Sequence, residues 1–165
     1  MKAEHINPFI RALINGFDTM LSCKVTRGEI HLKGDPQTKF EISGIIGLSG
    51  KAVGTVVVAL SESVALKAAS AMLMDEYTEI NDDVVDAVGE LANIVAGAAK
   101  AELAEFDMSV SLPNVITGKG HDVRFPSNVT PLCVPFECPW GELAIEVGLA
   151  PAPAEAGSMA TAGLA

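Results

Sequence analysis

The sequence predicts an α+β domain in which helices pack on one antiparallel sheet of about six strands. Apolar side chains recur at helical spacing in residues 5–21 and 82–105, whereas β-branched, glycine-punctuated runs elsewhere are typical of paired strands. An order of one helix and then three strands occurs twice, in residues 5–74 and 80–149. These observations predict one domain over residues 1–149 that is built from two pseudo-repeated halves.

The first half is expected to combine helices at its ends with strands between them. Its predicted elements are a helix, a strand, a hairpin of two strands and a second helix, at residues 5–21, 24–33, 39–48, 52–60 and 62–74. The hairpin strands are separated only by Ser49, Gly50 and Lys51, which is short enough for a tight connection. The run 53–60 is apolar throughout, as in a strand that is buried on both faces. Ser61 precedes the second helix and is expected to cap it.

The second half repeats this order up to its last strand. Its predicted elements are a long helix, a strand and a hairpin of two strands, at residues 82–105, 109–120, 127–137 and 140–149. Asn81 or Asp82 is expected to cap the long helix, because both side chains accept hydrogen bonds from a first helical turn. Residues 150–165 are rich in alanine and proline and carry nothing to bury, so we expect a disordered tail there.

The charge of the chain is strongly negative, with 11 basic and 21 acidic residues and a net charge of −10. This balance argues against nucleic acid and against an anionic membrane surface, because neither supplies a positive counter-charge. The apolar runs are far shorter than the roughly 18 residues of a membrane span, and no signal peptide is evident. Cys23, Cys133 and Cys138 are expected to be reduced thiols that act as small buried apolar groups. We therefore expect a cytoplasmic protein.

The helix predicted over residues 82–105 has a polar face of unusual composition. Its apolar side chains gather on one side, which must face the core: Val84, Val88, Leu91, Val95 and Ala99. Asp86, Glu90, Asn93 and Gly97 fall within a sector of roughly 40° on the opposite side, which we expect to be exposed. The positions around this sector are small, whereas solvated helix faces usually carry long charged side chains. A glutamate and an asparagine three residues apart also occur by chance on many helices, so the spacing alone establishes no site.

The segment from Asp86 to Gly97, DAVGELANIVAG, resembles the signature of the CheC/CheX/FliY phosphatase family of bacterial chemotaxis. That signature is an acidic or hydroxyl residue, three residues, a glutamate, two residues and an asparagine. Residues 44–70 resemble the family's strand–turn–strand–helix unit, and residues 112–121 resemble the strand that follows the signature helix. The resemblance covers nearly all of residues 5–149 and implies the same α+β fold.

The resemblance implies a protein phosphatase whose substrate is a phosphorylated CheY-like response regulator. It implies catalytic roles for Glu90, which would pair with a lysine beside the partner's phosphoaspartate, and for Asn93, which would position the attacking water. Asp86 and Gly97 would contact the partner protein, although Gly97 could equally serve helix–sheet packing. The Mg²⁺ of the reaction is expected on the response regulator, so the chain would need no metal or cofactor of its own.

The first predicted helix offers an incomplete match to the same signature. Asn15 could correspond to the amide, but Ala12 stands where the glutamate is expected. The resemblance therefore implies a single site and the CheX-like subgroup, which carries one such helix. That subgroup is known for homodimers, so a homodimer is implied as well.

Other interpretations remain open from the sequence. The same helix face, or a sheet edge, could hold a response regulator or a flagellar switch component without hydrolysis. A small-ligand-binding domain is a third possibility, although no aromatic-lined pocket or convergent polar set is evident. The stretch 118–121, GKGH, could suggest a phosphate loop, but a hairpin turn fits it better. Trp140 is expected to pack within the last hairpin, and the dispersed histidines argue against a metal site.

Overall fold

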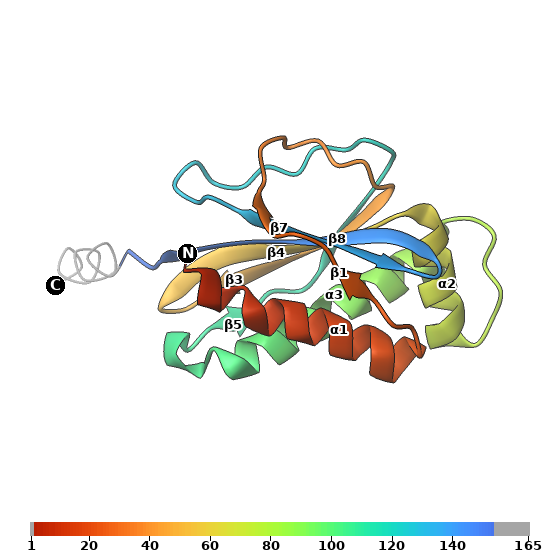
Figure 1. Cartoon of the computed structure of the whole chain (residues 1–165), viewed down its shortest axis with the longest axis horizontal. Helices are drawn as coiled ribbons and strands as arrows, with labels where there is room; N and C mark the ends of the chain where they lie inside the picture. The colour runs from red at the N-terminus through yellow and green to blue at the C-terminus, as the bar shows by residue number, and fades with distance from the viewer. Residues whose placement is uncertain (1, 154–165) are drawn as a thin grey trace, which may run out of the picture.

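The computed structural model describes residues 2–153, and its central feature is an antiparallel sheet with three α-helices packed on it (Figure 1). Along the chain the elements are η1 (Ala3–His5), α1 (Asn7–Leu21), β1 (Thr26–Arg27), β2 (His31–Leu32), β3 (Ile42–Ser49), β4 (Ala52–Leu60), α2 (Glu62–Leu73), α3 (Asp82–Glu102), η2 (Ala104–Phe106), β5 (Ser109–Val110), β6 (Asn114–Thr117), β7 (Leu132–Cys138) and β8 (Gly141–Pro151). The predicted α+β class is confirmed. The predicted tail begins too early, because Ala150 and Pro151 still belong to β8; its residues 154–165 lie outside the described part of the chain.

The sheet has eight strands rather than the predicted six, in the order β1-β7-β8-β4-β3-β5, with β2 also beside β7 and β6 also beside β3. The difference arises because the strands predicted at 24–33 and 109–120 are each broken into two short pieces. The break between β1 and β2 lies opposite Pro135 of β7, which has no N–H to donate to the ladder. Pro113 similarly precedes β6 and separates it from β5.

Two long hairpins form the centre of the sheet, as predicted. β3 pairs with β4 and β7 pairs with β8, and the two hairpins meet where β4 runs antiparallel to β8. The predicted burial of the run 53–60 on both faces is confirmed for residues 56–60, whereas residues 53–55 are only half-buried. The helices cover one face, and a smaller apolar cluster covers the other: Phe40, Val57, Ala59, Val123 and Ala144.

Local hydrogen bonds fix where the helices begin. The Asn81 side chain accepts the N–H of Val84 at 3.1 Å, so the predicted cap of α3 is confirmed. Ser61 occupies the N-cap position of α2, but its side chain makes no capping hydrogen bond. The N–H of Glu62 donates instead to the Glu41 carboxylate at 2.8 Å. Within residues 2–153, none of the helices has the length and apolar content needed to cross a membrane.

α3 lies directly on β3 at a glycine. A Cβ added to Gly44 would stand 2.8 Å from the Cβ of Ala92 and 3.2 Å from the carbonyl oxygen of Val88, both on α3. The missing side chain therefore lets the helix approach the strand closely. The predicted apolar stripe of α3 is confirmed, because all five of its members are buried: Val84, Val88, Leu91, Val95 and Ala99. The helix ends at Glu102, before the predicted end at residue 105.

Replacing Gly44 by alanine is expected to lower the free energy of unfolding by about 1–3 kcal/mol. The added Cβ would lie too close to Ala92, whose own Cβ is fixed to the helix backbone, so α3 must move away from β3. Gly16→Ala is the matched control, because the space around Gly16 in α1 is open and alanine favours a helix over glycine by about 1 kcal/mol. Urea unfolding of both variants and the parent checks this; a Gly44→Ala variant as stable as the parent would contradict it.

Candidate functional site

The polar face of α3 is turned away from the sheet, as its periodicity predicts. Asp86 and Glu90 are exposed, whereas Asn93 and Gly97 are half-buried on the same face. The expectation of an exposed Asn93 therefore needs correction. Its neighbours one turn away along α3, residues 89 and 96, are both buried, so Asn93 stands at the border of the packed surface. The helix thus presents an exposed carboxylate and, three residues on, a partly shielded amide.

The side chains of this face are not engaged within the molecule. Among residues 2–153, no hydrogen bond or ion pair involves the side chain of Asp86, Glu90 or Asn93. By contrast, Glu102 at the end of α3 forms an ion pair with Arg11 of α1 at 2.7 Å. The carboxylates and the amide near the middle of α3 are therefore available to a partner molecule.

The two glycines of α3 have different roles. A Cβ added to Gly97 would meet no atom within 4 Å, so this residue does not serve helix–sheet packing. A Cβ added to Gly89 would lie 3.3 Å from Val115 Cγ2 and 3.4 Å from Pro113 Cγ, so Gly89 does serve packing. Because Gly97 has no side chain to project from the helix beyond Asn93, another protein could approach the backbone closely there.

A hollow of about 450 Å³ lies beside the acidic side chains of α3. It is formed by the end of α2 and the start of α3, and its lining residues are Met72, Leu73, Asp83, Asp86, Ala87 and Glu90. Helical periodicity placed Asp86 and Glu90 on one face, but it missed the α2 wall because that contact is tertiary. The sequence signal that could have revealed this wall is the apolar pair Leu73 and Met74 at the end of α2. Both side chains are exposed in the structure.

Met74, directly after α2, combines high exposure with an unusual backbone conformation. It is 92% exposed and adopts a left-handed backbone conformation with φ of 55°, which is unusual for a residue other than glycine. The connection that follows is tied to α3, because the Tyr77 hydroxyl donates to the Asp83 carboxylate at 3.1 Å. Partial burial raises the pKa of Tyr77, and the Asp83 carboxylate adds to this shift. One wall of the hollow is thereby fixed against the other.

α1 does not present a second copy of this arrangement. Ala12, which occupies the position expected for a glutamate, is buried in the main core, whereas Asn15 is exposed. A carboxylate at Ala12 would therefore point into apolar surroundings instead of toward a partner. That α3 alone carries the site stays a prediction.

The thiols are poorly suited to nucleophilic chemistry. Burial, with a contribution from the neighbouring Cys138 thiol, raises the pKa of Cys23 to about 11. Burial and the charge of Glu146 raise the pKa of Cys133 to about 11 as well. Little thiolate therefore exists near neutral pH. All three cysteines are free, and the described residues contain no group of three or more metal-ligating side chains.

Two other motifs serve the fold. Gly118 and Gly120 have positive φ angles in a turn after β6 that opens no helix, which argues against a phosphate loop. The predicted hairpin is wrong, because β6 pairs with β3 and Asp122 beyond the turn bridges Gln37 instead of pairing with β6. His121 is held within 2.7 Å of the Gly118 carbonyl oxygen and 2.8 Å of the Ser43 hydroxyl. Trp140 lies in the turn between β7 and β8 and packs against the main core, as predicted.

Sequence comparison relates this arrangement to known proteins. The sequence model of the family described as Chemotaxis phosphatase CheX matches residues 42–137, which include both walls of the hollow and all of α3. The CheY-P phosphatase CheX of Thermotoga maritima is 26% identical over 127 residues, which span 75% of this chain and 82% of that protein.

Solved structures show the same fold at comparable or higher identity. The chemotaxis protein CheX from Vibrio vulnificus is 34% identical, with a TM-score of 0.84 over 90% of this chain and 100% of that one. A CheX–CheY–BeF3–Mg²⁺ complex from Borrelia burgdorferi matches with 25% identity and a TM-score of 0.77, over 90% of this chain and 99% of that one. The helix that carries Glu90 and Asn93 therefore lies within the portion of the chain that these proteins share.

Native Cys23 and Cys133 are expected to react slowly with iodoacetamide at pH 8 and faster as the pH approaches 11, because only the thiolate attacks. Their folded-state pKa lies above the ordinary value of 9.0, so the unfolded chain loses these protons first. Their contribution to the free energy of unfolding is therefore complete below pH 9 and is lost between about pH 9 and pH 11. Mass spectrometry of alkylated native and urea-unfolded protein measures the rates; fast labelling of native Cys133 at pH 8 would refute this.

Proposed function

The chain belongs to the CheX family of chemotaxis phosphatases, and we propose that it hydrolyses the aspartyl phosphate of a CheY-type response regulator. The Glu90–Asn93 pair carries this proposal: both side chains lie on the outer face of α3 with no partner among residues 2–153. Two relatives support the choice of substrate. The protein from T. maritima is named a CheY-P phosphatase, and the B. burgdorferi structure is a complex of CheX with CheY.

Asn93 orients the water that attacks the phosphorus in this proposal. An acyl phosphate is already activated and phosphoryl transfer has a loose transition state, so placing the water is the main contribution that remains. A carboxamide can accept a hydrogen bond from water and donate another, without adding negative charge beside the phosphoryl oxygens. The half-buried position of Asn93 restricts its rotamers and so favours one direction for the water.

Glu90 fixes the register between the two proteins. It is exposed one turn before Asn93, so a lysine beside the partner's phosphoaspartate could pair with it while Asn93 reaches the phosphoryl group. The Mg²⁺ that balances the phosphoryl charge would belong to the response regulator. This division of roles asks for no metal or cofactor on the present chain.

The hollow between α2 and α3 supplies the rest of the docking surface in this proposal. Its apolar wall includes Leu73, and the exposed Met74 follows directly in the chain. Asp83 and Asp86 add negative charge to the same hollow. Such a surface fits an apolar side chain with a basic residue next to it, and the contact would hold the partner against Glu90.

Replacing Asn93 by alanine is expected to lower the stimulated rate of phosphate release by about 100-fold or more, because the water loses its orientation. Binding of the response regulator activated with beryllofluoride should remain within about threefold of the parent, since that contact depends on Glu90 and the hollow. Asn15→Ala, on the equivalent helix α1, is the matched control and should leave both measurements unchanged. Phosphate release from the phosphorylated receiver and calorimetric titration give the two quantities.

The outcome separates an enzyme from a binding module that uses the same face. If the parent chain binds the receiver without accelerating phosphate loss, the chain is a binding module. If the parent accelerates the loss and the Asn93→Ala variant does so equally, Asn93 has no part in the chemistry. Glu90→Ala is expected to weaken binding and to slow hydrolysis together, because it alters the register as well as the contact.

Replacing Leu73 and Met74 together by serine is expected to raise KM for the phosphorylated receiver by about 10-fold while kcat changes little. These side chains would contact the partner at a distance from the phosphoryl group, so they contribute to binding rather than to chemistry. Leu112→Ser is the control, because Leu112 is also an exposed apolar residue but lies between β5 and β6, outside the hollow. Steady-state phosphate release measures both constants; an unchanged KM would remove the hollow from the interface.

A further inference from the structure

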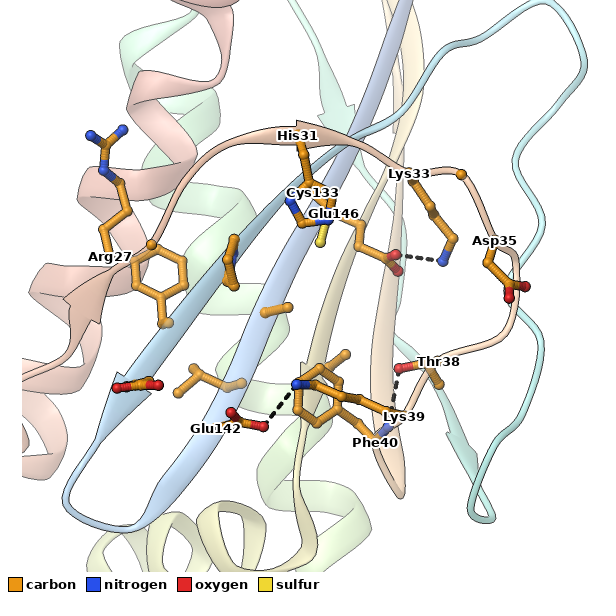
Figure 2. Close-up of a pocket in the computed structure, with 18 of the residues that line it drawn as sticks. Arg27, His31, Lys33, Asp35, Thr38, Lys39, Phe40, Cys133, Glu142 and Glu146 are labelled. Carbon is orange, nitrogen blue, oxygen red and sulfur yellow. Dashed lines mark hydrogen bonds and ion pairs between the residues drawn. The ribbon is translucent and has the colours of Figure 1, made fainter.

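A second cavity lies on the sheet face opposite the helices, away from the face of α3. It has a volume of about 580 Å³ and is lined by the segment 26–40, by strands β7 and β8 and by Ala59 of β4 (Figure 2). This volume is within the range of about 300–1,000 Å³ typical of small-molecule sites. The cavity shares no lining residue with the hollow beside Glu90, so it is a separate feature of the molecule.

The inner part of this cavity holds a charged pair in apolar surroundings. Glu146 lies in the middle of β8, between Cys133 on β7 and Val57 on β4. Figure 2 shows its carboxylate reaching toward Lys33, whose ammonium forms an ion pair with Glu146 Oε2. The two side chains are only 7% and 8% exposed, for Lys33 and Glu146 respectively. An ion pair this deep is costly to desolvate and is weak support for the fold.

The pair has hydrogen-bonding capacity that the protein does not use. Among residues 2–153, no donor reaches Glu146 Oε1, although this oxygen is buried. The Lys33 ammonium has three N–H groups, and its one hydrogen bond within the same residues goes to Glu146 Oε2. A free acceptor and free donors therefore lie side by side at the inner end of the cavity, where an unmade hydrogen bond is costly.

The charges select against ions. Besides His31, the cavity lining carries three basic and four acidic side chains: Arg27, Lys33, Lys39, Asp35, Glu137, Glu142 and Glu146. At the inner end Lys33 and Glu146 already neutralise each other, so an added anion would face Glu146 and an added cation would face Lys33. The Cys133 thiol beside them is uncharged near neutral pH, because burial raises its pKa to about 11. An uncharged ligand is the one that leaves the charges balanced.

Apolar surface next to the pair provides room for the body of such a ligand. Phe40, Ala59 and Ala144 line the same cavity, and all three are buried. The ring of Phe40 and the ion pair lie in one enclosure in Figure 2. The outer charges Lys39 and Glu142 form their own ion pair at 2.8 Å and do not compete for the inner groups.

We propose that this cavity binds a small uncharged molecule through a carboxamide or lactam edge. Glu146 Oε1 has less than 1 Å² of accessible surface in the free protein, so the ligand enters as the carboxylate turns this oxygen toward the cavity. The N–H of the ligand's edge then donates to Oε1, its carbonyl oxygen accepts from the Lys33 ammonium, and its apolar body contacts Phe40 and Ala144. Such an edge places one donor and one acceptor side by side in one plane, which matches the one unpartnered acceptor and the neighbouring ammonium donors. The site is independent of phosphatase activity, since it uses the opposite face of the sheet.

Benzamide is the probe that tests this proposal. Titrated into the ¹⁵N-labelled chain, it is expected to give saturable shifts of the amide signals of Cys133, Ala144 and Glu146, with a dissociation constant in the millimolar range. N,N-dimethylbenzamide has the same ring and carbonyl but no N–H, and it should bind at least 10-fold more weakly. Benzoate, which brings a negative charge, should bind at least 10-fold more weakly as well.

A double variant removes the recognition groups without leaving a lone buried charge. Lys33→Met with Glu146→Leu replaces the ion pair by apolar side chains, an exchange that proteins often tolerate. It should keep its amide spectrum elsewhere and lose at least 10-fold in benzamide affinity. Absence of saturable shifts with benzamide overturns the proposal, and so does equal binding of benzamide and N,N-dimethylbenzamide. Because the second comparison uses the parent chain, it decides the question even if the double variant does not fold.

Discussion

The seating of α3 on β3 at Gly44 is the contact on which the rest of the site depends. Ala92 and Val88 approach the strand so closely that the rotation of the helix about its axis is fixed. Because one side of α3 packs on the sheet, Asp86 and Glu90 must lie on the outer surface. Gly89 allows a similar close approach on the neighbouring side of α3, where the helix meets Pro113 and Val115. Small residues thus set the direction of the larger polar ones, and the orientation of the polar face follows from how closely the opposite face is packed.

The pair that makes α3 interesting could be predicted from the sequence because a helix repeats its geometry locally. The buried stripe and the opposing Glu90 and Asn93 follow from a period of 3.6 residues, without knowledge of the sheet. The partial burial of Asn93 and the hollow beside Leu73 could not be predicted in this way, because both depend on how the helices pack against their neighbours. Periodicity also missed the breaks in the outer strands, which Pro135 imposes from another strand. The homodimer implied by the resemblance stays a prediction.

The second cavity shows a further limit of pattern reading. Lys33 and Glu146 lie 113 residues apart in the chain, and each alone looks like an ordinary strand or loop charge. Their meeting depends on the segment after β2 folding back over β8, which no local pattern encodes. The alternation of side chains along β8 does place residue 146 on the face away from the helices, so the sequence predicts the face on which Glu146 lies. The sequence does not predict that Lys33 meets Glu146, because this is a tertiary contact that only the folded structure shows.

The sheet order makes the two halves of the chain depend on each other. The first half supplies the hairpin β3–β4 and the short strands β1 and β2, yet these short strands pair with β7 of the second half; β5 and β6 cross in the opposite direction to β3. Neither half can therefore complete its own sheet. The two long helices also differ: α1, with Ala12 buried and Arg11 paired with Glu102, supports the core, whereas α3 presents an outward carboxylate and amide.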